Sequence, residues 1–303
     1  GEYLAHVRAH DAARAHLEAA AALDPSNGDV VALLGYLEQE RKRPEQAAEL
    51  YQRALGLRLR RASSAAHAAR FALDREAGSG AAPDAGTGWL GTARRAAELA
   101  VELDPDYGEP WLLKGLVELR SNDPQAALVS FTEAQRRLPD RVDVAYNRFQ
   151  AAFAAGLSTV ARGLAEGSLR RLDPELAAQA MEQLEWKEAN ERIEAAVAEA
   201  NRRLEAGEPE TAVEPLRELL PAVRDADQRD YLERQIAWVE SWVAEKRLID
   251  GYNRAVSLAN AQKLREALSE LDSLLAGCDV GQAQVCAAAR DLRGQIAGFL
   301  GRR

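Results

Sequence analysis

Large aromatic side chains and long apolar runs are both scarce in this sequence of 303 residues. Only 6% of the residues are aromatic, so a core must be built from small and aliphatic side chains on closely approaching elements. No run approaches the roughly 18 consecutive apolar residues that cross a bilayer, so we expect a soluble chain without a membrane span. The sequence also starts without a methionine or a cationic and apolar leader, so its N-terminus does not indicate a compartment.

The sequence also lacks a net positive charge, because the formal net charge is −9 and the isoelectric point is about 5.2. Binding to nucleic acid requires a basic surface that releases counterions, so we predict no nucleic-acid partner. Alanine, in contrast, is abundant and favours helices. Length alone suggests about two globular domains of ~150 residues, but an alanine-rich helical chain can instead be a stack of small units.

A pattern of small and large residues recurs along the chain. A small residue is followed four positions later by a larger apolar residue and three positions further by another small one, as in Ala127, Phe131 and Ala134. These spacings place all three on one helical face. The copies start at Ala13, Ala47, Ala93, Ala127 and Ala161. Successive copies lie 34 residues apart except for 46 between Ala47 and Ala93, and we assign the surplus to a glycine-rich insertion at 77–91.

Another helix is predicted upstream of each copy. Each unit is therefore a helical hairpin, and the recurring pattern lies on its second helix. This pattern resembles the tetratricopeptide repeat (TPR) family, whose unit is a helix-turn-helix of 34 residues. The best match is the unit from Gly108 to Asp140, with Trp111, Gly115, Ala127, Phe131, Ala134 and Pro139 in the family's positions. The resemblance implies an all-α fold, a right-handed superhelical solenoid of antiparallel helix pairs.

The resemblance is strongest in the N-terminal half, so we predict TPR-like repeats over residues 1–174. Lys114, Arg148 and Phe149 depart from the family pattern, and we expect their units to pack less regularly. We interpret residues 175–303 as divergent repeats that continue the solenoid, with a separate helical bundle as the alternative. The helices expected there are Trp186–Ala206, Asp227–Lys246, one around Tyr252, one at Ala212 that contains Pro215, one at Ala267, and a terminal helix at Gln282–Phe299.

The resemblance also implies that the first helix of each hairpin lines a concave groove where partners bind. The residues predicted to line it are Tyr36, Gln39, Leu112, Leu116, Arg120, Tyr146, Asn147, Gln150 and Phe153. This mixture of apolar, aromatic and polar groups suits a peptide or helix of a partner protein. The alternative is that residues such as Leu112, Leu116 and Phe153 simply pack under neighbouring helices. We predict a non-catalytic scaffold for protein-protein interaction.

A second function is a structural subunit that binds further copies of itself. By register, Gly1 falls inside the first helix of the first hairpin, so that end lacks the polar cap that solenoids need. Either a preceding segment or another copy would cover it. In the second case, head-to-tail stacking would produce an oligomer or an open filament.

Cys278 and Cys286 are the two cysteines of the chain, and they lie close enough in sequence to form a disulfide. A disulfide favours an exported protein, in the periplasm or outside the cell, over a cytoplasmic one. The equally good alternative is two reduced cysteines that pack as small apolar residues.

No other sequence pattern predicts a catalytic, cofactor or metal site. Gly86, Gly88 and Gly91 form a G-x-G-x-x-G sequence, but no strand is expected before it, so a nucleotide site is disfavoured. His6, His10 and His16 cluster near the start, and the turn between two helices should separate them. We therefore predict no catalytic residues, no cofactor and no metal.

Overall fold

Every regular element that the computed structural model describes is a helix, which confirms the predicted all-α fold. The structure describes residues 10–57, 59–79, 88–278 and 283–300. It divides into two compact units, which we call unit 1 (Gly1–Leu184) and unit 2 (Glu185–Arg303). The division lies beyond residue 174, where the regular repeats were expected to end.

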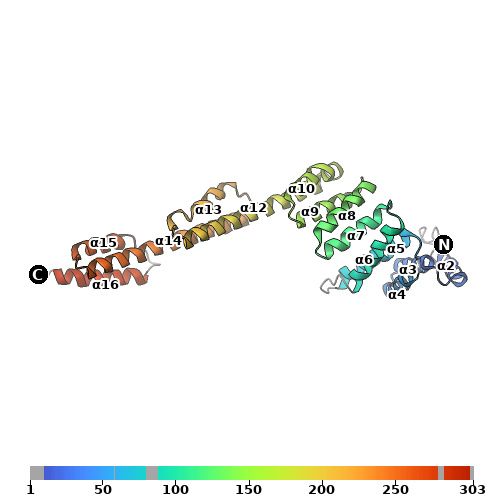
Figure 1. Cartoon of the computed structure of the whole chain (residues 1–303), viewed down its shortest axis with the longest axis horizontal. Coiled ribbons are helices and arrows are strands. Elements are labelled where there is room, and N and C mark those ends of the chain that lie inside the picture. The colour runs from blue at the N-terminus through green and yellow to red at the C-terminus, as the bar shows by residue number, and fades with distance from the viewer. Residues whose placement is uncertain (1–9, 58, 80–87, 279–282, 301–303) are drawn as a thin grey trace. The chain divides into compact units, whose positions relative to one another are not determined.

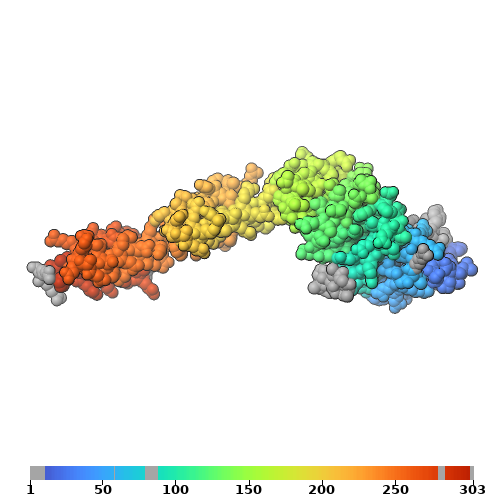
Figure 2. Space-filling model, viewed as in Figure 1, coloured from blue at the N-terminus to red at the C-terminus, as the bar shows by residue number. Residues whose placement is uncertain are grey.

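Unit 1 is a row of antiparallel helical hairpins (Figure 1). Its helices are α2 (His10–Leu23), α3 (Gly28–Glu40), α4 (Pro44–Gly56), α5 (Ala62–Ser79), α6 (Gly88–Leu103), α7 (Gly108–Arg120), α8 (Pro124–Arg137), α9 (Val142–Ala154) and α10 (Ser158–Leu164). A π-helical turn, η1 (Ala165–Leu169), and α11 (Arg170–Leu172) then continue α10. In the space-filling view of Figure 2 the green part of the chain, which includes α7, α8 and α9, presents one continuous surface.

The two helices of a hairpin meet where a small residue faces a large one sixteen positions later. A Cβ atom added at Gly115 would lie 2.6 Å from two ring carbons of Phe131, so α7 requires glycine there. At Gly35 the added atom would lie 3.2 Å from two ring carbons of Tyr51, which is tight but less severe. We call each such couple a contact pair. The small residue of the pair leaves room for the aromatic ring of the second helix, which is why that ring can be buried.

The same register defines a contact pair in the other hairpins. These pairs are Phe149 with Ala165, Ala200 with Leu216 and Ala255 with Leu271; across the extra twelve residues the equivalent positions are Ala69 and Ala97, which are both small. All eight residues are buried. In the Phe149 pair the large residue lies on the first helix, which reverses the usual order. The π-helical turn of the second helix begins at its partner, Ala165.

The turn between the two helices is also repeated. Seven residues after the first member of a contact pair, the backbone adopts a left-handed conformation, with φ between 58° and 80°, at Lys42, Asn122, Gly156, Gly207 and Gln262. The next amide then donates to a carbonyl five residues back, as from Arg43 to Glu38 and from Asp123 to Glu118, both at 2.9 Å. This is the Schellman arrangement that ends many helices.

In the hairpin of α5 and α6 the residue seven positions after Ala69, Glu76, is still helical, because the twelve extra residues lie here. The insertion predicted at 77–91 is helical at both ends, since α5 runs to Ser79 and α6 begins at Gly88. Both flanks of the glycine-rich stretch therefore extend helices instead of forming a loop. Residues 80–87 lie outside the described part of the chain.

Unit 2 is dominated by two long helices. Its elements are the second part of α12 (Pro174–Glu205), the 3-10 turn η2 (Pro209–Thr211), α13 (Glu214–Leu219), the 3-10 turn η3 (Leu220–Ala222), α14 (Ala226–Asn260), α15 (Leu264–Ala276) and α16 (Ala283–Leu300). None of the helices that the structure describes is long and apolar enough to cross a bilayer.

Several predicted boundaries in this half were wrong. The helix expected at Trp186–Ala206 begins at Pro174, because residues 175–185 are strong helix formers. The helices expected at Asp227–Lys246 and around Tyr252 are one helix, α14, since no proline separates them. Pro215 lies in the first turn of α13, where a missing N–H is tolerated, and not inside a longer helix.

Two apolar clusters hold unit 2 together. One joins α12, α13 and the first part of α14, and the other joins the last part of α14 with α15 and α16. Several large aromatic residues stay outside these clusters. Trp186, Tyr231 and Trp238 are 51%, 42% and 52% exposed.

Candidate partner-binding face

The first helices of unit 1 pack beside one another, α3 against α5, α5 against α7 and α7 against α9. Because the repeat is regular, residues at one repeat position fall on neighbouring helices. Tyr36, Leu116 and Gln150 share one position, and Gln39 and Phe153 share another. We therefore treat the predicted residues as one candidate surface. We call it the first-helix face, made of Tyr36, Gln39, Leu116, Arg120, Tyr146, Asn147, Gln150 and Phe153.

Side chains on this face bridge consecutive first helices. The ring of Tyr36 on α3 stacks on that of His67 on α5, with centroids 4.8 Å apart. A guanidinium nitrogen of Arg120 on α7 donates to the carbonyl of Leu73 on α5 at 2.7 Å. Gln150 on α9 donates to the side-chain oxygen of Gln183 on α12 at 3.4 Å. These contacts fix the spacing of the helices that carry the face.

One predicted residue does not reach the surface. Leu112 is only 2% exposed, because it packs in the same apolar cluster as Phe131 and Val144. The prediction that it lines a groove was therefore wrong, and the alternative of packing under a neighbour applies to it. The other residues are half-buried, except for Arg120, which is exposed.

Apolar and polar groups alternate on the first-helix face. Tyr36, Leu116, Tyr146 and Phe153 each pack one side against an apolar cluster while keeping some surface exposed. Gln39 accepts a hydrogen bond from the Tyr51 hydroxyl at 3.3 Å, and the Asn147 amide donates to the carbonyl of Asp143 at 2.8 Å. Such a surface can bind another polypeptide through both apolar contact and hydrogen bonds.

An ionic network beside this face was missed at the level of the sequence. The carboxylate of Glu109 on α7 binds Arg70 on α5 and also Arg141 before α9, the latter at 2.6 Å. Arg141 in turn pairs with Asp143 and lowers the pKa of that carboxyl group. The signal was available in the register, because Arg70 occupies the repeat position of Tyr36 and Leu116.

Burial perturbs two further charged groups in this part of unit 1. Burial raises the pKa of Glu118 on α7, against an opposing hydrogen bond from Ser130. Burial also lowers the pKa of Arg148 on α9, whose side chain donates to the hydroxyl of Thr132 at 3.1 Å. Each group contacts a second helix of unit 1, so these shifts accompany packing between helices.

The other predicted features are placed as follows. Within the described residues, no three His, Cys, Asp or Glu side chains converge as a metal site would require. His16 is exposed on α2, whereas His6 lies outside the described residues, as does the side chain of His10. The described element before Gly88 and Gly91 is the helix α5, and Gly86 falls outside the described residues.

Cys278 and Cys286 are joined by a disulfide in the structure, with their Cα atoms 6.1 Å apart. Cys278 follows α15, and Cys286 is buried in α16 within the second apolar cluster of unit 2. The bond therefore ties the last two helices of unit 2 together.

No protein-family model matches the chain, and no curated protein matches it. Solved structures that are similar include a MamA protein, with 16% identity over 59% of this chain and 90% of that chain and a TM-score of 0.46. YrrB, a TPR protein with an unusual peptide-binding site, has 17% identity over 60% and 88% and a TM-score of 0.49. PilF from Pseudomonas aeruginosa has 18% identity over 78% and 94% and a TM-score of 0.44.

At these identities and scores, the similarity alone decides nothing about this chain. The repeated contact pair, the repeated turn and the packing of first helices identify its architecture. The chain is an all-α solenoid of TPR-like helical hairpins.

Proposed function

We propose that this chain is a non-catalytic scaffold that binds a peptide or helix of a partner protein on the first-helix face. The observation that carries the proposal is a set of half-buried apolar and aromatic side chains on the first helices α3, α7 and α9, namely Tyr36, Leu116, Tyr146 and Phe153. Their packed undersides hold these four side chains in place, so they would lose little further side-chain entropy when a partner binds.

Selection from a displayed peptide library tests this proposal without a known partner. The selected peptides should bind the wild-type chain and lose at least tenfold in affinity for Leu116→Glu and for Tyr146→Glu. Val129→Glu is the matched control, because Val129 is an apolar residue 64% exposed on α8, a second helix. Binding that survives the first two variants, or that Val129→Glu reduces equally, would contradict the proposal.

Self-association is the second candidate function, and an exposed face of α16 favours it. A Cβ atom at Gly294 or Gly298 would meet no other group within 4 Å, and Phe299 nearby is 51% exposed. Such a surface would let another helix approach closely. Light scattering over a range of concentrations should then show assemblies that Gly298→Gln disrupts. A monomer at every concentration would exclude this function.

A further inference from the structure

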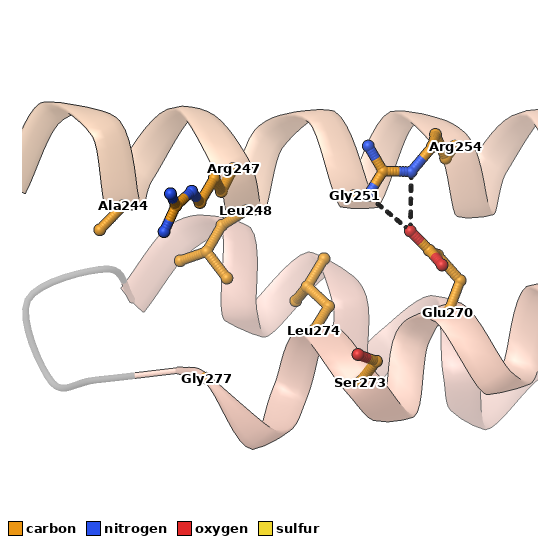
Figure 3. Close-up of a pocket in the computed structure, with 9 residues that line it drawn as sticks. All are labelled: Ala244, Arg247, Leu248, Gly251, Arg254, Glu270, Ser273, Leu274 and Gly277. Atoms are coloured by element: carbon orange, nitrogen blue, oxygen red, sulfur yellow. Dashed lines mark hydrogen bonds and ion pairs between the residues drawn. The ribbon is translucent and has the colours of Figure 1, made fainter. Parts of the chain in front are cut away.

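Unit 2 contains a hollow of about 340 Å³ between α14 and α15. Figure 3 shows its lining, with Arg247 and Arg254 at opposite ends and with Leu248 and Leu274 between them. Gly251 leaves room in the middle, since even one added carbon atom there would lie 3.3 Å from Leu274. The hollow therefore has a cation at each end and a narrow apolar floor.

Each of these arginines is oriented by a carboxylate of the chain. Glu270 on α15 accepts from both Nε and Nη2 of Arg254, at 2.8 and 2.7 Å. Glu210 in η2 accepts from Nε of Arg247 at 2.8 Å and also from Nη2. In both cases the Nε edge is occupied, and no described residue takes the Nη1 edge. Both side chains are well exposed, at 62% and 65%, so a ligand can reach that second edge.

A guanidinium group presents donors on two edges, and each edge suits a carboxylate or phosphate. Arg247 and Arg254 are seven residues apart on α14, which is two helical turns or about 10.5 Å along the axis. One small anion is too short to span that distance between side chains at opposite ends of the hollow. Two carboxylates on one polypeptide can do so, because residues three apart in a polyproline II chain lie about 9.3 Å apart on the same side.

We propose that this hollow binds an extended acidic segment of a partner protein, with one carboxylate on Arg247 and another on Arg254. The site shares no residue with the first-helix face, and this proposal does not depend on that face. Glu210 and Glu270 position the two guanidinium groups, and the floor of Leu248 and Leu274 contacts the residues between the two carboxylates.

The probe is a fluorescein-labelled peptide of four Glu-Pro-Pro repeats, whose prolines impose the polyproline II conformation. Its controls are the same peptide with glutamine for glutamate, and a peptide of equal length in which four adjacent glutamates are flanked by prolines. Fluorescence anisotropy against the full-length chain should show binding of the first peptide alone, and binding should weaken as salt is raised from 50 to 500 mM.

Arg247→Gln and Arg254→Gln should each reduce the affinity at least tenfold. Arg234→Gln is the matched control, because Arg234 is 69% exposed on the same helix and pairs with Asp230 at 3.1 Å. It should leave the affinity within twofold of wild type. Circular dichroism melts check each variant, and Arg247→Lys replaces Arg247→Gln if the latter unfolds, since lysine offers no second donor edge.

Three results would overturn the proposal. The first is no binding of the Glu-Pro-Pro peptide by the folded wild-type chain. The second is equal binding of the peptide with clustered glutamates, which would mean attraction by charge alone. The third is an equal loss with Arg234→Gln, which would place the peptide elsewhere on α14.

Discussion

Unit 1 and unit 2 use the same hairpin but join it differently. In both, a contact pair sixteen residues apart brackets a left-handed turn at the seventh residue, as in Gly115, Asn122 and Phe131 of unit 1 and Ala255, Gln262 and Leu271 of unit 2. In unit 1 a short link then separates the second helix from the next first helix. In unit 2 α14 runs through 35 residues without such a link.

The difference lies in the residues between hairpins. Most links of unit 1 contain proline, as at Asp104-Pro105 and Pro139-Asp140, and the proline stops the helix; the link between α4 and α5 does not. Between Asp225 and Gly251 unit 2 has neither proline nor glycine, so α14 continues. The hairpin and the break between hairpins therefore depend on different residues of the sequence. That unit 2 repeats the contact pair and the turn supports the proposal that residues 175–303 are divergent repeats.

The largest effect should come from the reversed contact pair of unit 1. Phe149→Ala removes a fully buried ring and should cost about 3–5 kcal/mol of stability. If the large residue can lie on either helix, Phe149→Ala combined with Ala165→Phe should recover at least half of that loss. Denaturant unfolding of both variants measures it. A double variant no more stable than Phe149→Ala would show that the π-helical turn at Ala165 fixes the order of the pair.

The disulfide should matter to unit 2 alone. Replacing both Cys278 and Cys286 by alanine opens a loop closed across a separation of eight residues, which should cost about 2.5 kcal/mol. Hydrogen exchange followed by mass spectrometry should show faster exchange in α15 and α16 and no change in α7 and α8. A matching loss of protection in α7 and α8 would contradict the prediction that the disulfide stabilises unit 2 alone. Two titratable thiols in the protein would contradict the bond itself.

The repeat register could be predicted from the sequence. Which side chains stay exposed, and which pair with a neighbouring helix, could not. The spacing of Ala47, Tyr51 and Ala54 predicted the hairpins of unit 1, because buried small residues must recur with the helical period. It did not distinguish the half-buried Leu116 from the buried Leu112, since both lie on α7 and only the neighbouring helices decide their exposure. The ion pairs of Glu109 depend in the same way on how neighbouring first helices are placed.

Glycine on the first helix should be needed where the facing ring is closest. Gly115→Ala forces a carbon to within 2.6 Å of the Phe131 ring and should cost about 1–3 kcal/mol. Gly35→Ala should cost less, because its clearance from Tyr51 is 3.2 Å. Gly163→Ala is the control: its Cβ would meet no other group within 4 Å, so it should stabilise α10 by roughly 0.5–1 kcal/mol. Thermal melts that rank these three variants otherwise would contradict the contact pair as the cause.

The smallest effects test whether the turn is the same in both units. Lys42 in unit 1 and Gln262 in unit 2 have φ of 61° and 63°, a conformation that costs a residue with a side chain roughly 1–2 kcal/mol. Glycine also loses more entropy on folding, by about 0.5–1 kcal/mol, so Lys42→Gly and Gln262→Gly should each stabilise by up to ~1 kcal/mol. Gly207→Ala should destabilise by a similar amount through the backbone alone, because its Cβ would meet no other group within 4 Å. Since the long helix α14 precedes Gln262 and the short helix α3 precedes Lys42, equal gains in denaturant unfolding would mean that helix length does not affect the turn. A gain at Lys42 alone would mean that the turn at Gln262 is held by its own side chain.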